Sequence, residues 1–155
     1  MQDPKSLTSV ALFHQTFKHP VLPSPTIPSE TRCNLRVSLL SEELKELEEA
    51  IENKDLVEIA DALCDLQYVL SGAILEFGLG EKIKALFDEV QRSNMSKACK
   101  TEEEAKATVA HYEAKGTPCF YEKEGDLFLV FREGDHKTLK SVNYSPADLK
   151  SILEV

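Results

Sequence analysis

Acidic side chains gather in two short stretches of the sequence, and their spacing places each group on one face of a helix. Residues three and four apart share a helix face. The first stretch contributes Glu42, Glu43 and Glu46, and the second contributes Glu58, Asp61 and Asp65. Carboxylate oxygens are the ligands that Mg²⁺ and Mn²⁺ prefer. Two such faces on neighbouring helices are typical of a divalent metal site, although an ordinary solvated acidic face carries the same charges.

Asp65 gives the strongest indication of a metal. It is the only charged residue from Ala62 to Leu75, in a segment that is apolar almost all round and is therefore expected to be buried. A buried carboxylate is costly unless it is protonated, paired or bound to a metal, and this stretch supplies no cation. Glu58 has a second explanation, because Asp55 is a good N-cap and Glu58 would complete a capping box with it.

Helical periodicity predicts that these carboxylates lie on the second and third of a series of helices. Helices are expected over residues 5–18, 30–53, 55–77, 81–97 and 101–115, a β-hairpin over 117–121 and 127–132, and a last helix from residue 145. The fold class is an all-α bundle of four to five helices with a small C-terminal β-hairpin and a short final helix. We expect a helical core over residues 1–100 and a C-terminal extension over 101–155 packed on it. The proline-rich residues 20–28 are expected to lie extended against the core.

Composition excludes several classes of protein. A chain of 155 residues with a net charge of −9 fits one acidic domain and argues against nucleic-acid binding through a basic surface. The sequence has no apolar run long enough to span a membrane and no N-terminal signal pattern. Its four cysteines are widely spaced, which favours reduced thiols and a cytoplasmic location. Apolar residues on nearly all sides of the third helix predict a homodimer or homotetramer.

An E-E-x-x-E helix followed closely by a second acidic helix resembles the MazG-like all-α nucleoside triphosphate pyrophosphohydrolases, part of the phosphoribosyl-ATP pyrophosphohydrolase-like superfamily. Four further features resemble the dUTP-hydrolysing subgroup: Phe13-His14 before the prolines, D-L-Q-Y-V at 65–69, E-V-Q-R-S-N-M-S-K at 89–97, and Y-S-P-A-D-L-K at 144–150. The resemblance covers residues 8–99 well and touches 140–153.

One position departs from the family pattern, which is E-x-x-D followed by an apolar residue, any residue and Tyr. Aligning the family's aspartate with Asp65 puts Ala62 where the glutamate is expected. Aligning it with Asp61 keeps E-x-x-D through Glu58 but loses the tyrosine. We favour the first alignment and expect Asp61 to replace the missing glutamate from one turn away.

The resemblance implies hydrolysis of a (deoxy)nucleoside triphosphate to the monophosphate and pyrophosphate, as nucleotide-pool house-cleaning. It implies Mg²⁺, with Mn²⁺ as an alternative, held by Glu43, Glu46, Asp61 and Asp65, with Glu58 as an additional candidate. Glu42 would orient or deprotonate water, and Lys97, Asn94 and Arg92 would contact phosphate. His14 and Tyr68 would line a base pocket. The residues alone leave a second explanation open for His14, as a packing residue, and for Arg92 and Lys97, as charges that favour a helix end.

Two other classes of protein remain open. One is a non-catalytic helical oligomerisation module whose acidic faces are solvated. The other is a regulatory protein that binds a nucleotide or a metal without turnover, which the alanine at position 62 allows.

Overall fold

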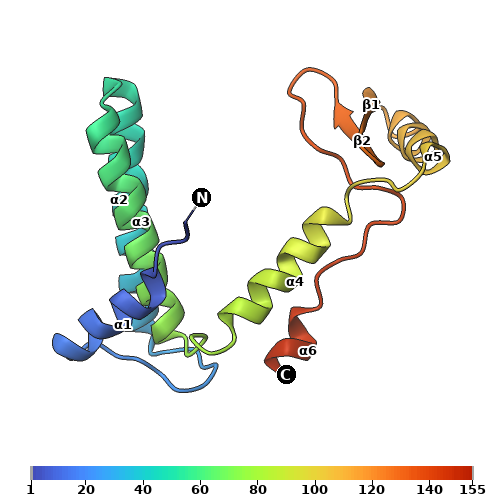
Figure 1. Ribbon diagram of the computed structural model, residues 1–155. Helices are drawn as coiled ribbons and strands as arrows, with labels where there is room; N and C mark the ends of the chain where they lie inside the picture. Colours follow the sequence, from blue (N-terminus) through green and yellow to red (C-terminus); the bar gives the residue numbers. More distant parts are fainter. Residues whose placement is uncertain (1, 155) are drawn as a thin grey trace. The chain divides into compact units, whose positions relative to one another are not determined.

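The computed structural model describes residues 2–154, and helices make up most of it (Figure 1). Its elements are α1 (Ser6–Thr16), α2 (Glu30–Asn53), α3 (Leu56–Glu76), α4 (Ile83–Met95), α5 (Glu102–Glu113), β1 (Cys119–Glu124), β2 (Leu127–Arg132) and α6 (Leu149–Leu153). The predicted helical fold with a small hairpin and a short final helix is confirmed. The chain forms two compact units, Met1–Ile83 and Lys84–Val155. No described helix has the length and apolar character needed to cross a bilayer.

Helices α2 and α3 form an antiparallel pair at the centre of the first unit (Figure 1). Lys54 ends α2 in the left-handed conformation, with φ of 56°. Asp55 then caps α3, because its side chain accepts hydrogen bonds from the backbone N–H groups of Val57 and Glu58 at 3.0 and 3.2 Å. The predicted bounds of α2 agree with the structure, and this short turn determines which residues of the two helices face each other.

Helix α1 and the proline-rich segment that follows it complete the first unit. Val10 and His14 are the buried residues of α1. The segment runs extended beside the end of α3, where the N–H of Leu22 donates to the carbonyl of Leu75 at 3.0 Å. Gly78 allows this close approach, because a Cβ there would lie 1.8 Å from the Ser24 carbonyl oxygen. The expectation of an extended segment against the core is therefore confirmed.

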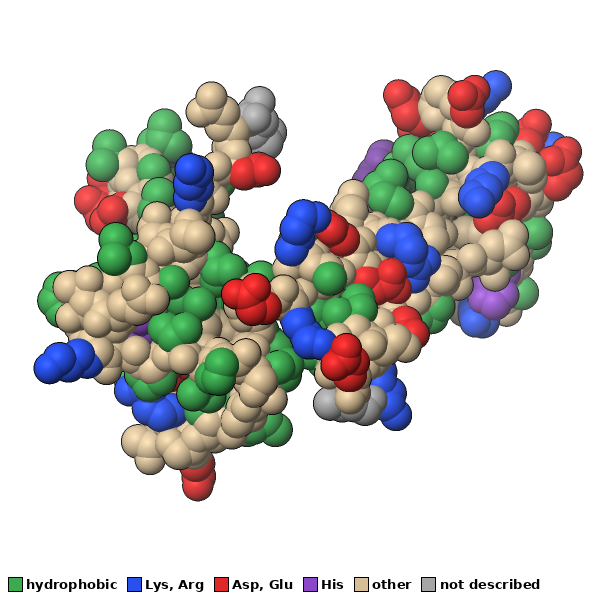
Figure 2. All heavy atoms as spheres, turned by 60° about the horizontal axis from the view of Figure 1, so that its bottom comes forward, with side chains coloured by type: hydrophobic (Ala, Val, Ile, Leu, Met, Phe, Trp, Pro, Cys, Tyr) green, Lys and Arg blue, Asp and Glu red, His purple; other side chains and the backbone are tan. Residues whose placement is uncertain are grey.

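Helix α3 is less buried than its composition suggested. Leu63 and Leu70 are 51% and 45% exposed in the single chain, and Asp65 is only partly buried. The expectation of burial on nearly all sides was wrong for the chain alone, since α1 and α2 pack against only part of the α3 surface. Hydrophobic side chains are accordingly visible at the surface of the first unit, on the left of Figure 2.

The second unit has its own small core beneath the hairpin. Its buried members come from the loop before α5, from α5, and from the hairpin and the chain after it: Cys99, Ala105, Cys119, Val130 and Leu139. Thr101 caps α5 by accepting from the Glu104 N–H at 3.1 Å. Strand β1 begins at Cys119 and not at residue 117, because pairing runs from Cys119↔Arg132 to the tight turn at Glu124↔Leu127.

The last helix also begins later than expected. Asp148 is its N-cap and accepts from the Ser151 N–H at 3.1 Å, so Ser145 and Pro146 precede the helix. The expected start at residue 145 was wrong, because the Ser145 hydroxyl accepts from Arg92 while Asp148 caps the helix three residues further on.

Candidate functional site

Glu43 lies at the centre of the predicted acidic cluster. Burial raises the pKa of its carboxyl above the ordinary value. Neighbouring carboxylates raise that pKa further, in decreasing order of effect Asp65, Glu46, Glu42 and Asp61. Carboxylates of both acidic faces therefore lie near enough to Glu43 to act on its charge. This arrangement is unfavourable by itself and would be relieved by a cation.

Glu58 lies nearer the turn than the rest of the cluster. It lines a surface cavity of about 550 Å³ with Glu46, Glu49 and residues of the turn. Its backbone N–H donates to Asp55, whereas the Asp55 N–H donates to the carbonyl of Ala50 at 3.0 Å. The cap predicted for α3 is thus present, while the Asp55 N–H uses a backbone acceptor in place of the Glu58 side chain.

The carboxylate oxygens are hard donors of the kind that suits Mg²⁺. Within residues 2–154, however, no three His, Cys, Asp or Glu side chains converge closely enough to hold a metal ion. Rotation of the flexible Glu and Asp side chains is needed before they could share one ion. The metal site and its ligands remain predictions.

A cavity of about 330 Å³ lies beside this cluster, between α1, α2 and α3. It is lined by Val10, Phe13, His14, His19, Arg32, Leu35, Arg36, Leu39, Glu43, Asp65, Tyr68 and Val69. Four residues predicted from the sequence thus line this one cavity: the carboxylates Glu43 and Asp65, and the proposed base-pocket residues His14 and Tyr68. Its volume is at the small end of the range for ligand pockets.

Aromatic rings form one side of the cavity. The rings of Phe13 and His19 are stacked, with centroids 5.8 Å apart and planes inclined by 17°. Tyr68 meets Phe13 edge-on at 5.6 Å. Flat faces of this kind are suited to stacking on a nucleobase.

Two arginines bring positive charge to the same cavity. Arg32 and Arg36 both donate hydrogen bonds to the carboxylate of Glu76, which is 1% exposed. Burial alone would raise the pKa of Glu76, but hydrogen bonds from Arg36 and Arg32 outweigh it and hold that pKa below its ordinary value. Since Arg36 precedes Glu43 by about two turns of α2, the basic and acidic groups are separated by about 10 Å along the helix.

Sequence reasoning missed Arg32, Arg36, His19 and Glu76. A signal was present, because Arg32 and Arg36 are four residues apart on α2 and share a face. Glu76 follows the apolar stretch of α3 directly and required a partner for the same reason as Asp65. The antiparallel register of α2 and α3 supplies that partner.

His14 is 2% exposed and holds two polar contacts. Its Nδ1 lies 2.9 Å from the carbonyl oxygen of Pro20, and its Nε2 lies 3.5 Å from Nη2 of Arg36. Burial lowers the pKa of His14; the Pro20 hydrogen bond opposes that effect and the Arg36 charge adds to it. His14 is therefore both a packed residue and a wall of the cavity, so the two explanations open from the sequence are compatible.

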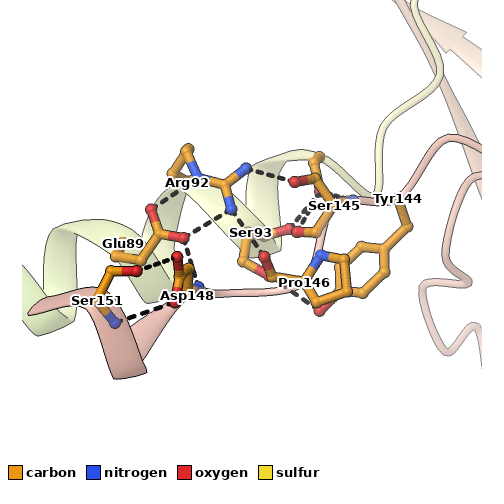
Figure 3. A network of polar contacts seen from close by, with 9 residues as sticks. Glu89, Arg92, Ser93, Tyr144, Ser145, Pro146, Asp148 and Ser151 are labelled. Atoms are coloured by element: carbon orange, nitrogen blue, oxygen red, sulfur yellow. Dashed lines mark hydrogen bonds and ion pairs between the residues drawn. The ribbon is translucent and has the colours of Figure 1, made fainter. Parts of the chain in front are cut away.

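The remaining predicted residues lie in the second unit. Nζ of Lys97 donates to Oδ1 of Asn94 at 2.8 Å. Arg92 donates to the Glu89 carboxylate, to the Ser145 hydroxyl and to the Pro146 carbonyl (Figure 3). Most N–H donors of Arg92 are thus already used, which favours a structural role over a phosphate contact.

The fold is helical, and acidic residues of two paired helices lie beside a cavity. Comparison with protein families matches residues 10–94 to phosphoribosyl-ATP pyrophosphohydrolase, which is more than half of the chain. The chain belongs to this family. Membership implies a pyrophosphohydrolase enzyme acting on a nucleotide substrate. No curated protein matches the sequence.

Proposed function

We propose that the protein hydrolyses a (deoxy)nucleoside triphosphate to the monophosphate and pyrophosphate, with Mg²⁺ bound by the acidic cluster. The observation that carries this proposal is the cavity that joins Glu43 and Asp65 to the aromatic rings of Phe13 and Tyr68. The carboxylates would bind the triphosphate through the metal ion, and the aromatic rings would stack on the nucleobase. House-cleaning of the nucleotide pool, as in the dUTP-hydrolysing MazG-like subgroup, is the role that fits such a substrate.

Each part of the site has a distinct role in this reaction. Glu43, Glu46, Asp61 and Asp65 would hold the ion, which would offset triphosphate charge and make water more acidic. Glu42 is exposed at the edge of the cluster and accepts a proton from the attacking water. The water oxygen bonds to the α-phosphorus while the bond to the α–β bridging oxygen breaks, and pyrophosphate leaves. Lys97 and Asn94 remain candidates for phosphate contacts.

The test is a panel of nucleoside and deoxynucleoside triphosphates together with phosphoribosyl-ATP, each with Mg²⁺, scored for pyrophosphate release and the identity of the second product. We expect turnover of at least one simple triphosphate. Turnover of phosphoribosyl-ATP alone would show that the family assignment holds but that our substrate proposal is wrong.

Matched variants connect the activity to the cluster. Glu43→Gln and Asp65→Asn keep the side-chain shape and remove a charge at the cavity, and each should reduce turnover by at least about 100-fold, or about 2.7 kcal/mol. Glu48→Gln removes an exposed charge on α2, the helix of Glu43, and serves as the control. Equal activity in all three variants would contradict the proposed site, and nucleotide binding without turnover in the wild type would favour a regulatory protein.

A further inference from the structure

Buried polar groups connect the three helices of the first unit in one continuous line. Glu76 of α3 binds Arg36 of α2, and Arg36 in turn lies against His14 of α1. These side chains are among the least accessible of the unit, with Glu76 1%, Arg36 7% and His14 2% exposed. The line ends at the carbonyl oxygen of Pro20, beyond the end of α1. Such a buried chain of hydrogen bonds is rigid only when every member is correctly protonated.

The proton on His14 follows from its two neighbours. A carbonyl oxygen only accepts, so Nδ1 of His14 carries the proton that it donates to Pro20 at 2.9 Å. A guanidinium only donates, so Nε2 presents its lone pair to Arg36 at 3.5 Å. His14 is therefore a neutral imidazole in the Nδ1–H form. The charged or titratable groups around it are Arg36 on α2, Glu76 on α3, and His19 after α1.

The guanidinium of Arg36 is bound by Glu76 and lies against Gly72. Glu76 binds its Nη2 atom, and Gly72 leaves space for the guanidinium, because a Cβ there would lie 2.7 Å from Nη1. The Nε atom of Arg36 is buried and has no hydrogen-bond partner among the described residues. Arg36 also lines the cavity. Its position is thus set by contacts across the α2–α3 pair, while one donor remains unused in a side chain that borders the proposed substrate.

The ring of His14 lies beside the aromatic rings of Phe13 and His19 in the lining of the cavity. Phe13 is adjacent in sequence, and the backbone N–H of His19 donates to the carbonyl of His14 at 2.8 Å. Phe13 and His19 form the stacked pair of the cavity. The His14 ring lies next to both of them, with its centroid 6.4 Å from that of Phe13 and 5.4 Å from that of His19, so its orientation affects how the pair packs.

We propose that Glu76 and Arg36 are positioning residues for substrate binding, which hold His14 as the neutral Nδ1–H imidazole and thereby place the Phe13–His19 wall against the substrate. This proposal rests on the proposed function for its substrate and on the geometry of the first unit for its mechanism. Neither Glu76 nor Arg36 takes part in bond breaking. Their loss is expected to weaken binding more than it slows the chemical step.

The test compares Arg36→Gln with Arg36→Lys and with Arg32→Gln. Arg36→Gln removes the charge beside His14 and leaves Glu76 paired with Arg32, so the fold can be retained; folding is verified by circular dichroism. We expect KM to rise at least about 10-fold with kcat changed by less than about threefold, since a lost hydrogen bond to a charged group is of this order. Arg36→Lys keeps a cationic donor and should recover part of the increase in KM.

Nuclear magnetic resonance of the His14 ring nitrogens gives a readout that does not need turnover. Wild-type protein should show the Nδ1–H form, and Arg36→Gln should raise the pKa of His14 because a repelling charge is removed. Arg32→Gln also removes one partner of Glu76, but the hydrogen bonds of the His14 ring within residues 2–154 go to Pro20 and Arg36, so this variant should leave the Nδ1–H form in place.

Three results would overturn the proposal. The first is an Nε2–H or charged His14 in the wild type, and the second is a His14 pKa in folded Arg36→Gln that equals that of the wild type. The third is a KM of Arg36→Gln within about twofold of wild type although the pKa of His14 has changed. If the wild type hydrolyses no nucleotide, the proposed function fails, while the ring-nitrogen measurement still decides whether Arg36 controls His14.

Discussion

Two glutamates of the first unit show how neighbouring residues alter the chemistry of one side-chain type. Glu43 and Glu76 lie on the paired helices α2 and α3. The pKa of Glu43 is raised by burial and by carboxylates around it, whereas the pKa of Glu76 is lowered because two arginines outweigh its burial. Glu76 therefore belongs to the framework, whereas the charge of Glu43 is in an unfavourable environment that protonation or a bound cation would relieve.

Without metal, the ionised carboxylate of Glu43 should destabilise the folded protein slightly. A carboxyl whose pKa is raised by folding binds protons more tightly in the folded state, so its contribution to stability falls as pH rises through that pKa. At neutral pH in EDTA, Glu43→Gln should therefore stabilise the fold slightly, by less than about 1 kcal/mol because the group is solvated. Thermal unfolding measures the effect, with Glu48→Gln as the control.

Addition of Mg²⁺ should make the wild type more stable than Glu43→Gln, which is the opposite of the order expected in EDTA. A ligand that binds only the folded state stabilises it by about 2.7 kcal/mol at 100 times its dissociation constant. Wild type should gain stability on titration with Mg²⁺, whereas Glu43→Gln should gain less. An unchanged melting temperature of the wild type up to tens of millimolar Mg²⁺ would argue against a metal site.

The second acidic helix allows a sharper comparison among three carboxylates. Asp61 contributes to the raised pKa of Glu43, as does Asp65, whereas Glu58 lies beside the cap of α3. Asp61→Asn and Asp65→Asn should each abolish most pyrophosphate release. Glu58→Gln should leave turnover largely intact. Activity at saturating Mg²⁺ is the measurement, and loss of activity in Glu58→Gln with retention in Asp61→Asn would show that our alignment of the second acidic motif is wrong.

At the scale of the elements, the α2–α3 pair approaches closely at Gly72. Gly72 is buried beneath Arg36 and His14, and an added Cβ would lie 2.7 Å from Nη1 of Arg36 and 3.0 Å from Nε2 of His14. Gly→Ala within a helix normally stabilises by about 0.5–1 kcal/mol. Here we expect Gly72→Ala to destabilise by about 1–3 kcal/mol, because Arg36 is held by Glu76 and cannot move away freely.

Gly80→Ala is the matched control for this prediction, since its Cβ would lie 3.5 Å from Leu75, an ordinary contact. Urea unfolding of both variants is the measurement. Equal stabilities would show that Arg36 adjusts to the methyl group without cost.

Arg92 illustrates a second contact between elements, in which α4 holds the segment before α6 (Figure 3). The hydrogen bonds from Arg92 and the Asp148 N–H lower the pKa of Glu89 to about 2, so the contact persists through mildly acidic pH. Ser93 and Tyr144 add a hydroxyl hydrogen bond of 2.9 Å nearby. The sequence features at 89–97 and 144–150 are therefore partners of one another.

Arg92→Gln should increase amide hydrogen exchange over residues 144–151. Arg132→Gln removes a similar exposed pair with Asp135 that does not reach this segment, and it should leave the exchange there unchanged. An increase in KM for Arg92→Gln without altered exchange would instead support the phosphate contact inferred from the family resemblance.

Local patterns predicted the helices better than the contacts between them. The bounds of α2 and the Asp55 cap follow from residue types within a few positions, and both agree with the structure. Strand β1 was misplaced because its ends are set by pairing with β2. The Arg32–Glu76–Arg36 group was missed for a related reason, since it joins residues 40 or more positions apart that only the register of two helices brings together.

At the scale of the whole molecule, each compact unit has its own buried residues, and the family match runs from the first unit into α4. The first unit leaves apolar residues at its surface in a regular pattern. Leu63 and Leu70 lie seven residues apart on α3 and are 51% and 45% exposed, and Leu44 and Ile51 have the same spacing on α2 with 51% and 56% exposed. Residues seven apart lie on one helix face, so each helix presents an exposed apolar stripe made of these two side chains.

These stripes predict that the protein is a homodimer or homotetramer. Burying one leucine contributes about 1.5–3 kcal/mol, and a helix pair that presents two stripes can pack against a second copy as in a four-helix bundle. Light scattering at micromolar concentration should give a dimeric or tetrameric mass. Leu63→Glu combined with Leu70→Glu should give the monomer, whereas Ile27→Glu, at an isolated site that is 83% exposed, should keep the assembly. A monomeric mass for the wild type would contradict the predicted assembly. A double variant that stays assembled would place the interface elsewhere on the chain.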